Sequence, residues 1–311
     1  MPKYTFLLPA YKGRFLNEML RSIQGQTYTD FKVIISDDCS PENLKIICEP
    51  YLSDPRFIYR RNAVNIGSKS LVAHWNLLVE MCDTEFMIMT SDDDMYEPQF
   101  LEEINMLTEK YPQVNLFRAR PNDVNNLGEI IKAEGPSEEL LTHEAFTLRL
   151  YDADVVGGEA AYCYRTKELI KKGMFVNFPL AWFSDDATNI MMSVEGCAVT
   201  KEALFNFRRT DIQITNQWGN PIICPQKVKA TLLFYKWMNK FLASRPATLK
   251  ENEIARRFHK KVYSNIQNYI YHCSPARFMS CLYYCPNDIG LYKFRMFLHY
   301  MHVRFMKNKR I

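Results

Sequence analysis

The chain has 311 residues, of which 47% are hydrophobic, so it is long enough for one large α/β domain with an appendage or for two domains. Its 39 basic and 35 acidic residues leave a net charge of +4, which gives no indication of nucleic-acid binding. Nine cysteines at irregular spacing indicate reduced thiols in a cytoplasmic protein, and no apolar run is long enough to predict a transmembrane helix.

The first 118 residues alternate between strand-like and helix-like segments. Short apolar runs predict strands at residues 4–8, 31–36, 57–59, 86–90 and 114–118. Apolar residues at helical spacing predict helices at residues 15–24, 71–82 and 98–111, and a further helix that starts at Ser40. Alternation with short connections indicates an α/β fold, a Rossmann-like and mostly parallel sheet flanked by helices.

The last third of the chain has a different pattern. Helical signals dominate from about residue 226, so we expect a domain of residues 1–224 followed by a helical region of residues 225–311. This region combines aromatic with basic residues. One interpretation is a helical cap with solvated charges, and another is a basic amphipathic surface that contacts the membrane peripherally at its cytoplasmic face.

Acidic residues follow two of the predicted strands directly. Asp37 and Asp38 follow the second strand, and Asp92, Asp93 and Asp94 follow the fourth. The carboxyl ends of parallel strands lie at one edge of the sheet, where ligands of open α/β sheets bind. Five carboxylates there would repel one another, which favours a bound Mg²⁺ or Mn²⁺. The alternative is a solvated acidic turn in which an aspartate caps the next helix.

The chain resembles the family-2 glycosyltransferases, which have the GT-A fold, from residue 4 to about 118 and more weakly to about 215. The residues that carry the resemblance are 6–11 (Phe-Leu-Leu-Pro-Ala-Tyr), 20–31 (Leu-Arg-Ser-Ile-Gln-Gly-Gln-Thr-Tyr-Thr-Asp-Phe), 34–40 (Ile-Ile-Ser-Asp-Asp-Cys-Ser), 65–67 (Asn-Ile-Gly), 75–76 (Trp-Asn) and 91–94 (Ser-Asp-Asp-Asp), with Pro98 after them.

The resemblance implies a site for a nucleotide-sugar donor. The backbone around Pro9 and Ala10 and the ring of Tyr11 would hold the nucleobase, and Asp38 would accept the imide hydrogen of uracil. That contact suits uridine or thymidine better than guanine. Asp92 would lie near the ribose.

The acidic triplet resembles the family's DxD metal-binding motif, with one departure. Aligned on Pro98, the family's first aspartate falls on Ser91, so the expected ligands of Mn²⁺ or Mg²⁺ are Asp93 and Asp92. Which acid of the triplet dominates ligation stays open.

The weaker half of the resemblance implies the acceptor side, with Gly158, Trp182 and Asp185 near the acceptor. Asp186, the second acid of the pair, would be the general base, although either acid of the pair is also suited to capping the helix that follows. Two further residues, Arg208 and Arg209, are suited to the donor diphosphate or are ordinary surface charge.

These features together predict an inverting, metal-dependent transferase that moves a sugar from a UDP- or dTDP-sugar to a hydroxyl of a carbohydrate or lipid-linked acceptor, in polysaccharide or glycolipid biosynthesis. A sugar-phosphate nucleotidyltransferase would show a Gly-rich loop after the first strand, and a dehydrogenase would show G-x-G-x-x-G; the chain has neither. A degenerate relative that binds nucleotide or a partner without turnover remains an alternative, because Ser91 interrupts the motif.

Overall fold

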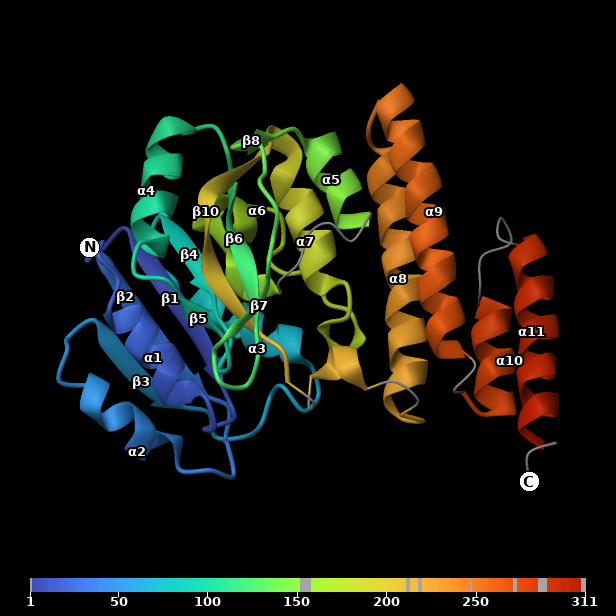
Figure 1. Ribbon diagram of the computed structural model, residues 1–311, viewed down its shortest axis with the longest axis horizontal. Coiled ribbons are helices and arrows are strands. Elements are labelled where there is room, and N and C mark those ends of the chain that lie inside the picture. Colours follow the sequence, from blue (N-terminus) through green and yellow to red (C-terminus); the bar gives the residue numbers. More distant parts are fainter. Residues whose placement is uncertain are drawn as a thin grey trace. The chain divides into compact units, whose positions relative to one another are not determined.

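The computed structural model describes residues 2–151, 158–210, 213–217, 220–246, 248–270, 273–284 and 290–308 (Figure 1). These residues form two compact units. The first, here called the sheet unit, comprises Met1–Asn177 and Ser184–Thr210; the second, the helical unit, comprises Phe178–Phe183 and Asp211–Ile311. The boundary expected between residues 224 and 225 falls in the first turn of a helix, and the division into domains there stays a prediction.

The sheet unit is built on one ten-stranded sheet in the order β3-β2-β1-β4-β9-β6-β10-β5, with β7 paired to β6 and β8 to β10. The strands are β1 (Tyr4–Ala10), β2 (Phe31–Asp37), β3 (Phe57–Arg61), β4 (Phe86–Met89), β5 (Met95–Tyr96), β6 (Leu116–Val124), β7 (Ile130–Ala133), β8 (Leu140–Leu141), β9 (Tyr162–Arg165) and β10 (Cys197–Arg208).

The direction of the strands changes in the middle of the sheet. Strands β3, β2, β1 and β4 run parallel to one another, as the alternating pattern predicts. Strand β9 lies antiparallel between β4 and β6, while β6 and β10 are again parallel. The α/β class is confirmed; the sheet is mixed, and the sequence analysis did not predict β9.

Helices flank this sheet (Figure 1). They are α1 (Leu16–Gln24), α2 (Leu44–Cys48), α3 (Leu71–Glu80), α4 (Phe100–Lys110), α5 (His143–Tyr151), α6 (Thr166–Lys171) and α7 (Ser184–Met192), with short 3₁₀ turns η1 (Glu49–Tyr51), η2 (Glu159–Ala161) and η4 (Ser193–Glu195). Apolar side chains repeat at helical spacing and are fully buried, as Leu16, Leu20 and Ile23 are in α1. Burial of this apolar stripe holds the helix on the unit.

One helix begins later than the sequence predicts. Helix α2 starts at Leu44, with Asn43 rather than Ser40 before it. The hydroxyl of Ser40 instead donates a hydrogen bond to the carbonyl oxygen of Tyr11, 2.6 Å away. Ser40 therefore joins the loops that follow β2 and β1.

The helical unit confirms the expected helical C-terminal part. It contains α8 (Ile223–Ala243), α9 (Leu249–Ile270), α10 (Pro275–Tyr284) and α11 (Gly290–Asn308), with 3₁₀ turns η3 (Pro179–Ala181) and η5 (Ile214–Asn216). The segment of residues 178–183 belongs here because Phe183 stacks on Phe234 of α8, with ring centroids 4.6 Å apart. No helix among the described residues is long and apolar enough to cross a membrane.

Candidate functional site

The loops after β1 and β4 meet at the carboxyl edge of the sheet. One carboxylate oxygen of Asp92 accepts hydrogen bonds from the backbone N–H groups of Tyr11 and Lys12, at 2.8 and 2.7 Å. The backbone N–H of Asp38 donates to the carbonyl oxygen of Ala10, at 2.9 Å. The structure thus brings together the residues predicted to bind the nucleotide, and the Tyr11 side chain remains 39% exposed at the end of β1, beyond Pro9.

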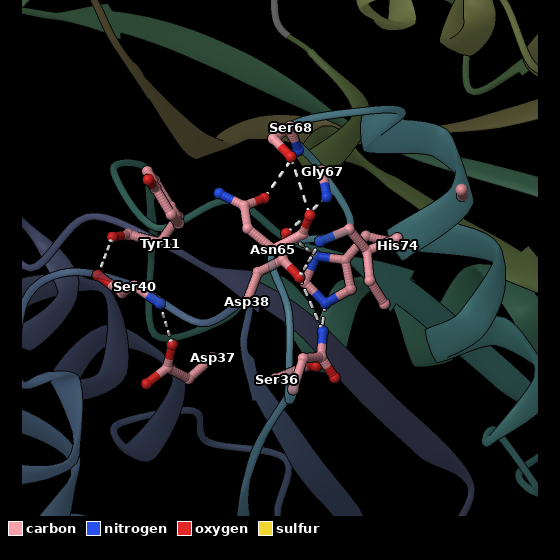
Figure 2. A network of polar contacts seen from close by, with 12 residues as sticks. Tyr11, Ser36, Asp37, Asp38, Ser40, Asn65, Gly67, Ser68 and His74 are labelled. Atoms are coloured by element: carbon pink, nitrogen blue, oxygen red, sulfur yellow. Dashed lines mark hydrogen bonds and ion pairs between the residues drawn. The ribbon is translucent and has the colours of Figure 1, made fainter.

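Asp38 organises the loop that follows β3 (Figure 2). Its Oδ1 accepts hydrogen bonds from the Asn62 side chain and the Ile66 N–H, at 2.8 and 2.9 Å, and its Oδ2 accepts one from the Gly67 N–H at 2.6 Å. Burial raises the pKa of this carboxyl, but these three donors outweigh that effect and the pKa is lowered overall. Asp38 is therefore a charged carboxylate, only 3% exposed, and its contact with a nucleobase stays a prediction.

Ser36, His74 and Asp38 lie in a row that resembles a hydrolytic triad (Figure 2). His74 Nε2 is 2.9 Å from the Ser36 hydroxyl, and its Nδ1 is 3.6 Å from Asp38 Oδ2. Ser36 is a fully buried residue of β2, however, so its hydroxyl is inaccessible to a substrate. Burial also lowers the pKa of His74, although Asp38 opposes the shift. The row is a buried polar network that holds α3 to the sheet, and no sequence motif marks it.

Asp37 is neutralised separately from Asp38. Its Oδ1 accepts a hydrogen bond from the Ser40 N–H at 2.8 Å, and its Oδ2 accepts one from the Tyr59 hydroxyl at 2.6 Å and pairs with Arg61. The charges of Asp37 and Asp38 are thus balanced by local donors. These local partners relieve part of the repulsion for which the sequence analysis expected a cation. The assignment of Asp93 and Asp92 as metal ligands stays a prediction.

The acidic triplet is crowded and partly desolvated. Burial raises the pKa of Asp92 to about 6 and that of Asp94 to about 8, and repulsion from Asp93 adds to both shifts. Asp94 Oδ1 accepts a hydrogen bond from the backbone N–H of Arg208 at 2.9 Å, and its Oδ2 accepts one from the Ser91 hydroxyl. Two of the three carboxylates therefore bind backbone groups directly. Burial raises the pKa of the third, Asp93, and the charges of Lys12 and Arg208 oppose only part of that shift.

Arg208, at the end of β10, is fully buried behind the triplet. Its guanidinium donates to the carbonyl oxygens of Asp93 and Asn126, at 2.9 and 2.8 Å, and pairs with Glu18 of α1 at 2.6 Å. The same group lies 4.1 Å from the centre of the Phe15 ring. These contacts link β10, the acidic loop and α1. They favour a positioning role, and contact of Arg208 with a diphosphate stays a prediction.

Arg209 differs from its neighbour in exposure. It is 38% exposed and pairs with Asp123 of β6 at 3.0 Å. Its guanidinium also lies 4.7 Å from the centre of the Phe207 ring. The Arg209 side chain is therefore held at the surface of the sheet unit, and its contact with a diphosphate also stays a prediction.

Carboxylate oxygens are ligands that magnesium and manganese ions prefer, so the triplet has suitable chemistry, and metal binding there stays a prediction. Among the described residues, no group of three or more His, Cys, Asp or Glu side chains is arranged to hold a metal ion. These ions, however, commonly use only one or two protein carboxylates and take their other ligands from phosphates and water. Burial is the main cause of the raised pKa values of Asp92 and Asp94, and a bound cation would oppose that shift.

The 3₁₀ turn η2, which follows the predicted acceptor-side residue Gly158, contacts strand β5, which follows the acidic loop. The Tyr96 hydroxyl, two residues after the triplet, donates to the carbonyl oxygen of Ala160 at 2.9 Å. Gly158, which precedes η2, lies against the ring of Phe207, and a Cβ there would be 3.5 Å from that ring. Gly157, the other glycine of the predicted pair, lies outside the described residues.

The predicted acidic pair lies in the first turn of α7, where the helix N-terminus favours negative charge. Asp185 and Asp186 are both partly exposed. Glu159 of η2, which the sequence analysis missed, is buried; burial first, and then the charge of Asp185, raises its pKa well above the usual range. Trp182 belongs to the helical unit, so its place beside the acidic pair stays a prediction.

The comparison with protein families decides the identity. Residues 5–175, more than half of the chain, match the family model described as glycosyl transferase family 2. The chain belongs to this family. The resemblance seen in the sequence is thereby confirmed, and with it the general class of glycosyltransferase.

Curated relatives match only part of this family-2 glycosyltransferase. An uncharacterized glycosyltransferase of Haemophilus influenzae is 25% identical over 54% of this chain and 55% of its own length. The chondroitin synthase of Escherichia coli is 33% identical over 33% of this chain and 15% of its own length. The glycosyltransferase GlyG of Streptococcus pneumoniae is 25% identical over 59% of this chain. The chain thus matches less than two thirds of the length of these relatives.

Solved structures confirm the GT-A fold. Residues 1–349 of TarS from Staphylococcus aureus, in complex with UDP-GlcNAc, are 14% identical and superpose with a TM-score of 0.61 over 96% of this chain and 89% of that one. A mannosyltransferase of Pyrobaculum calidifontis, in complex with GDP-Man and Mn²⁺, is 13% identical, with a TM-score of 0.57 over 90% of this chain and 74% of that one. At these identities the likeness concerns the fold.

Proposed function

We propose that this family-2 glycosyltransferase moves a sugar from a UDP- or dTDP-sugar to a hydroxyl of a carbohydrate or lipid-linked acceptor, with inversion, in the synthesis of a polysaccharide or glycolipid. The observation that carries the proposal is the pair of hydrogen bonds that the backbone N–H groups of Tyr11 and Lys12 donate to Asp92, which join an exposed aromatic ring to an acidic loop. A uridine nucleotide in the TarS structure supports the choice of donor.

The donor would bind across the joined loops. The exposed ring of Tyr11 offers a stacking surface to a nucleobase, next to the backbone of Pro9 and Ala10. Asp38, with its pKa lowered, is charged and therefore an acceptor for an imide hydrogen. Guanine in the same position presents a different pattern of donors and acceptors, so this contact would favour uracil or thymine.

Asp93 and Asp92 would hold a magnesium or manganese ion with the donor's phosphates. When bound, such an ion neutralises the charge that develops on the diphosphate leaving group. Asp93 is the first choice because Asp92 already binds two backbone N–H groups and Asp94 binds the backbone of Arg208. Arg208 would keep the Asp93 backbone in place.

Asp186 would act as the general base. Its carboxylate takes the proton of the acceptor hydroxyl while that oxygen forms a bond to C1 of the sugar and the bond from C1 to the phosphate oxygen breaks. The electron pair of the broken bond leaves with the nucleoside diphosphate. Attack in line with the departing group inverts the anomeric centre, and holding the two substrates in this line supplies much of the acceleration.

The test is release of nucleoside diphosphate from a panel of UDP-, dTDP- and GDP-sugars, with carbohydrate and lipid-linked acceptors. We expect turnover with a uridine or thymidine donor. Asp186→Asn should lower kcat by about 10²–10⁴-fold without weakening donor binding, because a positioned base contributes about that much. The control is Glu168→Gln in α6, a partly exposed residue that pairs with a neighbouring lysine of the same helix, and its kcat should be unchanged.

Three outcomes count against parts of this proposal. Full activity in Asp186→Asn would show that another group is the base. Turnover with GDP-sugars alone would overturn the assignment of the donor. Uridine nucleotide that binds without turnover with any acceptor would favour the alternative, a degenerate nucleotide-binding protein in which Ser91 has replaced a required aspartate.

A further inference from the structure

A groove with a basic rim lies between α8 and α10 of the helical unit. Its volume is about 520 Å³. Three cations line it: Lys229 and Lys236 from α8, and Arg277 from α10. Apolar lining comes from Pro225, Leu232 and Leu233.

The three cations of the groove are available to a ligand. All three side chains are exposed, and among the described residues no carboxylate pairs with them. Arg277 donates one hydrogen bond, from Nη1 to the carbonyl oxygen of Pro221 at 2.8 Å, which ties α10 to the start of α8. The groove therefore offers concentrated positive charge over an apolar floor.

Charge is segregated among the helices of this unit. Helices α8, α10 and α11 contain nine lysines and arginines and no aspartate or glutamate. The acidic residues of the four helices, Glu251 and Glu253, are both on α9. A surface with one sign of charge is not complementary to itself, so a second copy of this chain is a poor occupant.

Exposed apolar side chains lie on α10, which lines the groove, and on α11, which packs against α10. Phe294, Leu298 and Met301 of α11 follow one another at helical spacing and are each more than half exposed, as are Met279 and Tyr283 of α10. On its other face α11 buries Met296 and Tyr300, and the Tyr300 ring stacks on Phe278 of α10 with centroids 3.7 Å apart. A dissolved phosphate compound would gain nothing from these apolar side chains, whereas a lipid surface would bury them.

We propose that the helical unit docks on an anionic membrane surface through α10 and α11, with the phosphate of an anionic phospholipid bound in the groove at Lys229, Lys236 and Arg277. Apolar residues with flanking cations are the combination that binds an interfacial helix to anionic lipid. This inference uses no residue of the donor site, so it stands or falls independently of the proposed transferase activity.

The test is co-sedimentation of the full chain with vesicles of phosphatidylcholine alone and of phosphatidylcholine with phosphatidylglycerol. We expect binding to the anionic vesicles only, weakened by salt. The variant Lys229→Gln/Lys236→Gln/Arg277→Gln should bind about a hundredfold more weakly, since each cation near such a surface contributes about fivefold. Phe294→Ser/Leu298→Ser should weaken binding at high salt as well, because it removes apolar contact.

The matched control, Lys250→Gln/Arg256→Gln/Lys260→Gln, removes the same charge from exposed positions of α9. It should retain most of the binding. Equal losses in the two triple variants would show that only net charge matters and would overturn the groove assignment. Binding of glycerol phosphate as tight as that of the vesicles would overturn the lipid assignment, as would failure to bind anionic vesicles. Unchanged circular dichroism shows that each variant is folded.

Discussion

Asp38 holds the loop after β3 and is bonded to the end of β1. Its two oxygens are held by three N–H donors from residues 62–67, and its backbone is bonded to Ala10. A carboxylate held in this way is charged and cannot rotate freely. The loop after β3 is thereby fixed beside the place proposed for the nucleobase.

Gly67 allows this arrangement, because a Cβ at that position would lie 2.9 Å from Asp38 Oδ2. Gly67→Ala should push the carboxylate from its donors and lower the free energy of unfolding of the sheet unit by about 1–3 kcal/mol. Affinity for UDP should fall with it. Gly135→Ala is the control, since no atom lies within 4 Å of its Cβ, and thermal melting measures both. Equal melting temperatures would contradict the role given to Asp38.

The sequence analysis located the acidic residues but not their partners. Asp37, Asp38 and the triplet follow apolar strands, and the parallel order of those strands brings them to one edge. The donors that stabilise the Asp38 carboxylate come from a loop without a periodic pattern. Arg61 reaches Asp37 only because strand β3 pairs with strand β2. Such contacts depend on register and loop path, which residue spacing does not reveal.

At the scale of elements, β10 holds the acidic loop to the rest of the sheet unit. Its last residue, Arg208, bonds the backbone of Asp93 and the carbonyl of Asn126 and reaches Glu18 of α1. Its own N–H binds Asp94. One side chain therefore fixes the loop after β4 between α1 and the turn that joins β6 to β7.

Arg208→Met should destabilise the sheet unit by about 2–4 kcal/mol, because two carbonyl groups lose their donor and Glu18 loses its ion pair. The affinity for UDP in Mn²⁺ should also fall, through displacement of Asp93. Arg209→Met serves as the matched control and should cost at most about 1 kcal/mol, since its ion pair is partly exposed. Chemical denaturation followed by circular dichroism compares the two. A similar loss in both variants would show that Arg208 has no special role.

Strand direction is the part of the fold that local pattern predicts least well. The alternating segments up to residue 118 place β1 to β4 and the helices α1, α3 and α4 correctly, because each carries a clear apolar period, whereas α2 begins later than predicted. Strand β9 is only four residues long, and its pairing with β4 and β6 is antiparallel. A strand as short as Tyr162–Arg165 shows no recognisable apolar period, and its direction of pairing cannot be read from its residues.

At the scale of the whole molecule, the chain combines a sheet unit that carries the donor-site residues with a helical unit that carries a basic groove. The two units alternate along the sequence, because residues 178–183, which lie between two segments of the sheet unit, belong to the helical unit. The single boundary near residue 224 is predicted because helical signals dominate after it. Interleaving of this kind has no signature in composition.

The central claim, a nucleotide site at the sheet edge, is tested most directly by thermal melting with UDP and with GDP, each with and without Mn²⁺. We predict a rise in melting temperature with UDP that Mn²⁺ enlarges; at 100 times the dissociation constant a ligand stabilises by about 2.7 kcal/mol. Asp93→Asn should remove the effect of Mn²⁺, and GDP should give a smaller shift. No shift with either nucleotide, in Mn²⁺ or without it, would contradict the account of the donor site.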